Sequence, residues 1–316
     1  MSEELLDEAV RLDEEGQSER ALFIWKQLAA GDPTRSVLLG LGNCAKKLGL
    51  RDEAERAFKR ALELDGRSEI TLRSLGILAL DRGDYATAVE YLKRACSIEQ
   101  TAGGLTVLGV ALSRTRNDPD AETAYRKAIQ IDPKYEEAYY NLGVLLRQNG
   151  RSSESPPLLK KAIELDPGYA AAHRELGFVL MKRGLDPETE SHLRKAVELA
   201  PDDAWAHIYL GTYLWGIDAD AAEVEFRIAA KLQPTWAVPL TSLGSIYESR
   251  DLGLARSFFA RALELEPDNW SALTGLARAY VKRGETDLAR EYIIRALQQH
   301  PRDPRSLALL SEIDSE

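Results

Sequence analysis

Apolar residues in this chain recur at intervals of three and four residues, the spacing that gathers them on one face of an α-helix. One such set comprises Ala138, Tyr139, Leu142 and Leu146. After a short polar connection, a second set with the same kind of spacing follows. The pattern predicts pairs of amphipathic helices along the whole chain, and we expect no strand anywhere.

The predicted helix pairs repeat with a period of 33 or 34 residues. A Leu-Gly pair marks the first helix of most units, and in the last unit Leu276-Ala277 takes its place. A small residue and an alanine follow at fixed distances on the second helix, and a proline closes most units. The Leu-Gly pairs are Leu41-Gly42, Leu75-Gly76, Leu108-Gly109, Leu142-Gly143, Leu176-Gly177, Leu210-Gly211 and Leu243-Gly244.

Each recurring residue type has a physical reason. Small residues are needed where two helices of a unit cross closely. A large apolar residue on the second helix, such as Phe58, Tyr125 or Phe259, fills the space around the crossing. A proline such as Pro133 cannot continue a helix and therefore ends the second one. One unit alone cannot bury its apolar faces, so we expect the units to stack into an α-solenoid.

This pattern resembles the tetratricopeptide repeat, a 34-residue helical hairpin. The resemblance covers nearly the whole chain and implies an all-α, right-handed superhelix. We expect residues 1–316 to form one solenoid of nine hairpins, closed by a capping helix over 304–314. The expected units are 2–34, 35–68, 69–101, 102–135, 136–169, 170–203, 204–236, 237–269 and 270–303.

Two local features give sharper expectations. Pro156 and Pro157 are tolerated only in a first helical turn, so Ser155 is expected to cap a second helix that starts late. In the capping helix, Leu307, Leu310 and Ile313 are expected to share the face that covers the ninth unit.

Composition and charge exclude several classes of function. The formal net charge of −10 makes nucleic acid an unlikely ligand by the physics of phosphate neutralisation, and we expect no nucleic-acid partner. No apolar run approaches the ~18 residues that span a bilayer, so no membrane insertion is expected. The first residues are strongly acidic, unlike a secretory signal. With only two cysteines, we expect a reducing, cytoplasmic location.

Enzyme and cofactor motifs are absent from the sequence. It contains no phosphate-binding glycine loop and no H-E-x-x-H metal motif. Cys44 and Cys96 fall at positions that hold small apolar residues, which predicts buried, inert thiols. His173 and His207 occupy the packing position that Tyr139 holds in another unit. We therefore expect no catalytic residue, no metal and no cofactor.

Binding residues are expected on the first helices, which line a concave groove in the family that the chain resembles. With the Leu-Gly pair at positions 7 and 8 of each unit, positions 2, 5, 6, 9 and 12 face this groove. Exposed aromatic and arginine residues are typical of binding hot spots. The predicted groove residues are Arg73, Tyr140, Asn141, Val144, Arg147, Arg174, Phe178, Met181, Trp205, Ile208, Tyr209 and Trp215.

The groove of units two to six is predicted to be positive. With position 13 included, its cations outnumber its acids by seven to three. We therefore expect a protein or peptide partner with an acidic segment and large apolar anchors. An alternative is that these cations pair with nearby acids and the aromatics pack between first helices. The cations are Lys46, Lys47, Arg73, Arg114, Arg147, Arg174 and Lys182, and the acids are Asp81, Glu137 and Glu175.

Two functions remain open. The first is a non-catalytic adaptor or scaffold that binds a peptide or partner helix in its groove. The second is a structural solenoid that self-associates or braces a larger assembly. The groove does not match the family's clamp for a C-terminal carboxylate, because the repeat with Asn43 at position 9 has Leu39 where the clamp has lysine at position 5. It does not match the family's asparagine ladder either, because Asn141 is the single asparagine at position 6.

Overall fold

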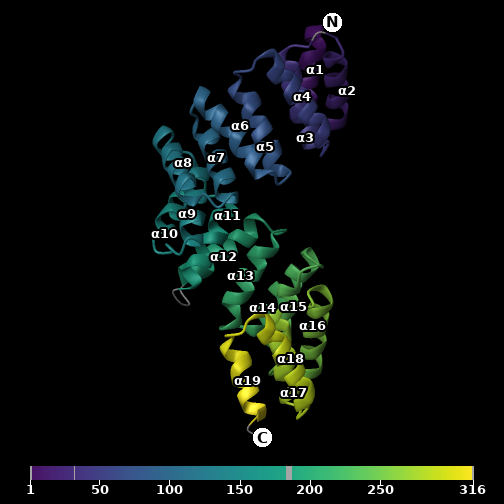
Figure 1. Cartoon of the computed structure of the whole chain (residues 1–316), viewed down its shortest axis with the longest axis vertical. Coiled ribbons are helices and arrows are strands. Elements are labelled where there is room, and N and C mark those ends of the chain that lie inside the picture. The colour runs from purple at the N-terminus through teal and green to yellow at the C-terminus, as the bar shows by residue number, and fades with distance from the viewer. Residues whose placement is uncertain (1, 32, 183–186, 315–316) are drawn as a thin grey trace. The chain divides into compact units, whose positions relative to one another are not determined.

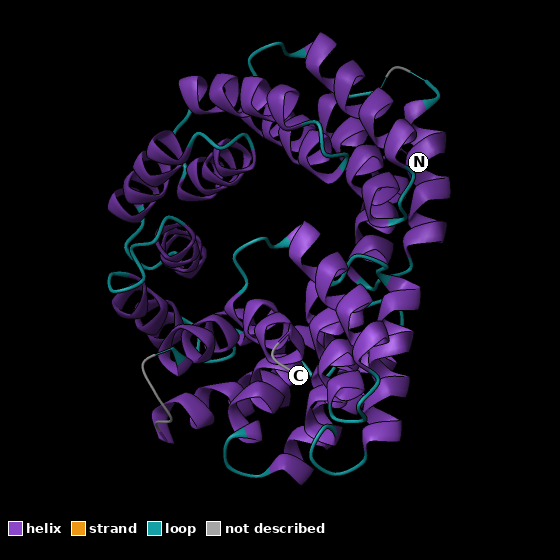
Figure 2. Cartoon of the chain, turned by 60° about the horizontal axis from the view of Figure 1, so that its bottom comes forward, coloured by secondary structure: helices purple, strands orange, loops and turns teal. Residues whose placement is uncertain are grey.

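The computed structural model describes residues 2–31, 33–182 and 187–314, and every regular element in them is an α-helix (Figure 1; Figure 2). The helices form two compact units, Met1–Pro167 and Gly168–Glu316, each of which contains several of the predicted repeats. From here on, the first unit and the second unit are these two parts of the chain. The first unit contains α1 (Ser2–Glu14), α2 (Ser18–Ala29), α3 (Arg35–Lys47), α4 (Arg51–Leu64), α5 (Glu69–Asp81), α6 (Tyr85–Ile98), α7 (Ala102–Arg114), α8 (Asp118–Ile131), α9 (Glu136–Gln148) and α10 (Ser155–Leu165). The second contains α11 (Ala170–Met181), α12 (Pro187–Leu199), α13 (Ala204–Trp215), α14 (Ala219–Leu232), α15 (Ala237–Tyr247), α16 (Leu252–Leu265), α17 (Trp270–Val281), α18 (Thr286–Gln299) and α19 (Pro304–Asp314).

Consecutive helices pack against each other as hairpins. In the first unit the pairs run from α1–α2 to α9–α10, and in the second from α11–α12 to α17–α18, followed by α19. The helical hairpins predicted from the repeat are therefore confirmed over the described residues. The single solenoid of residues 1–316 stays a prediction.

The repeated glycine sits where the two helices of a hairpin cross. A Cβ atom on Gly42 would lie 2.3 Å from Cε1 of Phe58, which is fully buried. In the second unit a Cβ atom on Gly244 would lie 2.7 Å from Cε1 of Phe259. Both distances are too short for any side chain, which explains why glycine recurs at this position.

Helix ends follow the local sequence. The first helices α3 and α7 carry side-chain caps, since Thr34 accepts from Val37 N at 3.4 Å and Thr101 from Gly104 N at 3.0 Å. The predicted role of proline is confirmed, because α8 ends at Ile131 and Pro133 follows its C-cap.

The predicted cap at Ser155 is wrong, although α10 does start late. Ser155 is the first residue of the helix, and Glu154 occupies the cap position without a side-chain bond. With Ser155 as the cap, Pro157 would stand at the second helical position without an N–H, which leaves the Leu158 N–H as the one donor for a serine cap. The Ser155 hydroxyl is buried without a hydrogen-bond partner.

The covering face of α19 also differs from the prediction. Ser306, Leu309 and Ile313 are buried, whereas Leu307 is 44% exposed. The Ser306 hydroxyl lies 2.9 Å from the Thr274 hydroxyl of α17, and this hydrogen bond turns the polar residue inward. The expected capping helix is therefore present, but the face that it buries is not the one that its apolar pattern predicts.

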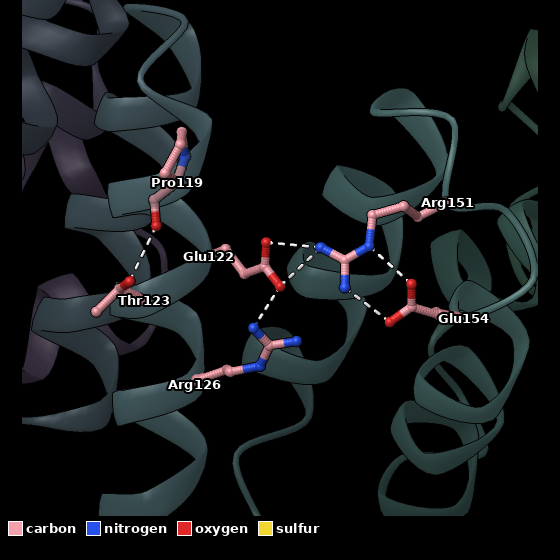
Figure 3. Close-up of polar contacts among 6 residues, drawn as sticks. All are labelled: Pro119, Glu122, Thr123, Arg126, Arg151 and Glu154. Atoms are coloured by element: carbon pink, nitrogen blue, oxygen red, sulfur yellow. Dashed lines mark hydrogen bonds and ion pairs between the residues drawn. The ribbon is translucent and has the colours of Figure 1, made fainter.

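An arginine in the connection between two helices of a hairpin links that hairpin to the preceding one. Arg151 lies between Glu122 of α8, at 2.9 Å, and Glu154, at 2.7 Å (Figure 3). Arg82 pairs in the same way with Glu55 of α4 at 2.6 Å. In the second unit Arg250 contacts Glu223 of α14 at 3.3 Å. The link therefore recurs in both units.

Candidate functional site

Four aromatic residues lie in contact along the first helices of the second unit. Phe178 of α11 stacks on Tyr209 of α13, with ring centroids 4.6 Å apart. The ring centroid of Trp205 of α13 lies 5.6 Å from that of Tyr209 and 4.9 Å from that of Trp236, the residue before α15. These four residues are called the aromatic cluster below.

The aromatic cluster is partly packed and partly accessible. Trp205 is 39% exposed, and the other three side chains are half-buried. Tyr209 and Trp236 pack against the core of the unit, which fixes their positions. The cluster thus combines the two arrangements considered for these aromatics: its base is packed, while Trp205 offers an accessible indole face.

Cations border the aromatic cluster. The Lys182 ammonium lies 5.1 Å from the centre of the Phe178 ring, within the range of a cation–π interaction. Arg174 forms an ion pair with Asp203. The Asp203 carboxylate also accepts from Trp205 N at 2.9 Å and so caps the helix that carries Trp205. The ion pair and the exposed indole therefore both lie at the N-terminal end of α13.

The remaining predicted residues of this unit have different surroundings. Ile208 is only 4% exposed and packs in the core, so the prediction that it contacts a partner is wrong. Its position, one residue from Tyr209, turns it toward the neighbouring helices. Met181 is half-buried against the same core. Trp215 is 43% exposed at the end of α13.

The predicted residues of the first unit are more polar. Arg73 forms an ion pair with Glu69 at 3.0 Å. Burial raises the pKa of the Glu69 carboxyl, and the charge of Arg73 opposes this rise. Asn141 donates to the carbonyl of Glu137 at 2.8 Å. Tyr140, Val144 and Arg147 are half-buried on α9.

Several predicted cations are partly neutralised. Arg73 and Arg174 have the acidic partners described above, and Lys47 lies 3.2 Å from Asp13 of α1. Sequence reasoning did not find Asp13, Asp203 or Trp236 as neighbours of the predicted surface. Trp236 immediately precedes a first helix, two residues before the nearest position searched, Val238.

Titratable residues of the packing layer are engaged in structural bonds. His207 Nε2 donates to the Pro201 carbonyl at 3.0 Å, and its Nδ1 lies 2.6 Å from Glu225. The Cys44 thiol is buried and bonds the Ser18 carbonyl at 3.1 Å. Burial, reinforced by Asp13, raises the pKa of Cys44 to about 11. Among the described residues, no cluster of three or more metal-ligating side chains occurs.

The described helices lack the properties of a membrane span. None of them combines enough length with enough apolar character to cross a bilayer.

Family models match four stretches of the chain. Models described as tetratricopeptide repeat match residues 33–101, 140–204 and 247–313, and one described as TPR repeat matches 117–150.

Individual proteins resemble parts of the chain. A probable UDP-N-acetylglucosamine–peptide N-acetylglucosaminyltransferase, SPINDLY, from Hordeum vulgare is 31% identical over 114 residues, which is 34% of this chain and 12% of that protein. The chain spans less than a fifth of the length of the curated relatives it matches, between 12% and 18%.

Two solved structures share the fold. One is the APC/C hetero-tetramer Cut9-Hcn1, with a TM-score of 0.66 and 17% identity over 93% of this chain and 59% of that one. The other is PilF of Pseudomonas aeruginosa, with a TM-score of 0.59 and 19% identity over 67% of this chain and 97% of that one.

Proposed function

Because this chain belongs to the tetratricopeptide repeat proteins, we propose that it is a non-catalytic scaffold that binds an acidic protein segment on its first-helix face. The observation that carries the proposal is the aromatic cluster of the second unit, where Trp205 is exposed on a packed aromatic base. A large apolar side chain of the partner would rest on this indole.

Rigid aromatic residues suit such a role. Phe178, Tyr209 and Trp236 are held by stacking and by the core, so that presenting Trp205 costs little conformational entropy. Hot spots of protein interfaces are enriched in tryptophan, tyrosine and arginine for this reason.

The charges beside the aromatic cluster favour an acidic segment. Lys182 is exposed next to Phe178, and a carboxylate approaching it would meet a cation in a protein whose net charge is −10. Arg174 is already paired with Asp203, so its attraction to a partner is weaker than that of an isolated guanidinium. Such local complementarity fixes orientation and specificity more than affinity.

A non-catalytic role is consistent with the use of the titratable residues. His207 is bonded at both ring nitrogens, and burial holds the Cys44 thiol protonated at neutral pH. Neither group is arranged as a nucleophile or a general base. The match with the glycosyltransferase covers 12% of that enzyme, so its activity is not transferred to this chain.

Peptide selection tests the proposal directly. Phage-displayed random peptides would be selected on the immobilised full chain, on Trp205→Ala and on a matched control, Phe23→Ala. Phe23 is 63% exposed on α2, a second helix, far from the first-helix face in the repeat. We expect acidic peptides with a large apolar residue, retained by the control and lost by Trp205→Ala.

The same selection has two outcomes that would overturn the proposal. One is an equal yield of peptides from Trp205→Ala and the unmodified chain. The other is an absence of enriched peptides together with a concentration-dependent mass in light scattering, which would favour the self-associating solenoid.

A further inference from the structure

A polar cavity of about 300 Å³ opens in the first unit between α7, α9 and the connection that follows α7. Its polar lining consists of Ser113, Arg114, Arg116, Tyr125, Asn141 and Gln148. No acidic residue lines it, although acids outnumber basic residues in the chain by 51 to 41. The cavity therefore has the charge of an anion site.

Arg116 has an unusual backbone. Its φ of +60° is the only positive value for a non-glycine among the described residues. The same point of five other hairpin connections is occupied by glycine, with φ between 72° and 78°: Gly16, Gly49, Gly83, Gly150 and Gly284. A side chain in this left-handed region is unfavourable compared with glycine. Local strain of this kind is often found where a side chain has a function.

Neither Arg114 nor Arg116 forms a side-chain hydrogen bond or an ion pair within the described part of the chain. Arginines in the neighbouring connections do, since Arg82 pairs with Glu55 and Arg151 with Glu122.

The sequence explains this difference. Glu55 and Glu122 occupy the same repeat position, and the hairpin before Arg116 has Val89 there. The acid that would neutralise the connection is therefore missing at the one connection where arginine replaces glycine.

Other donors complete the lining. Gln148 and Ser113 face the cavity beside the two guanidinium groups. The ring of Tyr125 packs against Gly109, so the floor of the cavity belongs to the rigid packing layer. Burial raises the pKa of Tyr125, the charge of Arg114 opposes the rise and that of Asp118 adds to it, so the phenol is a neutral donor.

We propose that this cavity binds a phosphate monoester, carried as a phosphorylated side chain on a protein partner of the scaffold. A phosphate monoester carries a charge of about −1.5 to −2 at neutral pH, which matches two guanidinium groups, whereas one carboxylate would leave one of them unneutralised. Guanidinium groups also bind phosphate oxygens in a bidentate manner. The anion chemistry stands on the cavity alone, while the protein source of the phosphate rests on the proposed function.

Calorimetric titration of the full chain with phenyl phosphate tests the anion chemistry, with benzoate as the monoanionic counterpart. We expect saturable binding of phenyl phosphate at least about 10-fold tighter than that of benzoate. Equal affinities, or no saturable binding, would overturn the proposal. Binding should also strengthen as the pH rises through about 6, where the second phosphate proton dissociates.

Three variants locate the site. Arg114→Gln and Arg116→Gly should each weaken phenyl phosphate binding by about 10-fold, the loss expected from one charge-assisted contact. Arg60→Gln removes the same charge from an exposed arginine of α4 outside the cavity and should leave binding unchanged. Equal losses in all three variants would indicate general charge attraction and contradict the site.

Arg116→Gly separates function from folding. Glycine removes the left-handed strain, so the thermal midpoint should rise by about 2 °C while binding weakens. A loss of binding in a more stable chain cannot come from misfolding. A raised midpoint with unchanged binding would show that Arg116 has no part in the site.

The source of the phosphate is tested with a phosphoserine peptide that is selected on the unmodified chain and lost on Arg116→Gly. It should bind more tightly than both phenyl phosphate and the same peptide with unmodified serine. If phenyl phosphate binds as tightly as the phosphopeptide, the ligand is a small phosphorylated molecule and the partner assignment fails. Trp205→Ala should abolish binding of the acidic peptides selected on the aromatic cluster yet keep phenyl phosphate binding, so failure of the scaffold role is distinguishable from failure of the anion site.

Discussion

The two units are built on the same hairpin but differ in what their first helices present. In the second unit Trp205 and Phe178 occupy positions 2 and 9 and belong to a stacked aromatic cluster. In the first unit Glu137 and Val144 occupy the same positions on α9, and an arginine-lined cavity lies beside them. Position 8, in contrast, is glycine on α9, α11 and α13 alike.

This difference separates two kinds of constraint. Position 8 is fixed because backbone and ring approach too closely for any side chain, as at Gly42 and Gly244. Positions on the first-helix face have no such restriction, so that they are free to carry aromatic chemistry in one unit and anion chemistry in the other. Binding specificity in a repeat protein is therefore local to a few repeats, whereas stability is distributed over all of them.

The shared packing layer gives the largest expected effect. Gly42→Ala and Gly244→Ala should each destabilise the chain by about 1–3 kcal/mol, because the new methyl group overlaps the ring of Phe58 or Phe259. Urea unfolding followed by circular dichroism measures both. Gly66→Ala is the matched control, since nothing but the Leu62 carbonyl, at 3.9 Å, lies near its Cβ position. A large cost in one unit only would break the equivalence of the two.

The aromatic cluster gives the next effect, on binding. Phe178→Ala should weaken the binding of a selected acidic peptide by about 1–2 kcal/mol at both low and high salt, because it removes apolar contact. Arg174→Glu should weaken it more at low salt, where charge repulsion is unscreened. Fluorescence anisotropy measures both variants, with Phe23→Ala on α2 as control. Unchanged binding in both would place the binding site on another surface.

The fold follows from the sequence because its determinants are local and repeated. Leu41-Gly42 and Phe58 specify one crossing, and the same residue types recur in register along the chain. The errors occurred where one residue had two competing roles. Ser155 is the first helical residue rather than the cap, and Ser306 faces inward because it bonds Thr274.

The candidate site was only partly predictable. Position in the repeat selected Phe178, Trp205 and Tyr209, which the structure places in contact. It also selected Ile208, the residue before Tyr209. Consecutive residues of a helix point about 100° apart, so Ile208 faces the neighbouring helices and is buried. The left-handed backbone of Arg116 has a sequence signal, an arginine where other units have glycine, but its meaning depends on the cavity beside it.

The thiol of Cys44 tests whether the packing layer of the first unit is dry. Its pKa in the folded chain is raised from 9.0 to about 11, mainly by burial. The neutral thiol therefore stabilises the folded state below about pH 9, and this contribution is lost as the pH rises through about 11. We expect the urea midpoint to fall over this interval, and less steeply in Cys44→Ala. Rapid labelling of the native thiol at pH 8 would contradict this burial.

The arginine links between hairpins give the smallest effect and test a shared feature on the surface. Arg151 and Arg250 make equivalent ion pairs in the two units, and both side chains are about one-third exposed or more. Because exposed pairs are screened by water and salt, Arg151→Gln and Arg250→Gln should each lower the urea midpoint only slightly, and not at all in concentrated salt. Arg151 also lowers the pKa of Glu154, so its contribution is present above the unfolded pKa of that carboxyl and is lost as the pH falls through the folded one. A loss that persists in high salt and at low pH would show that the arginine stems stabilise the hairpins by packing rather than by charge.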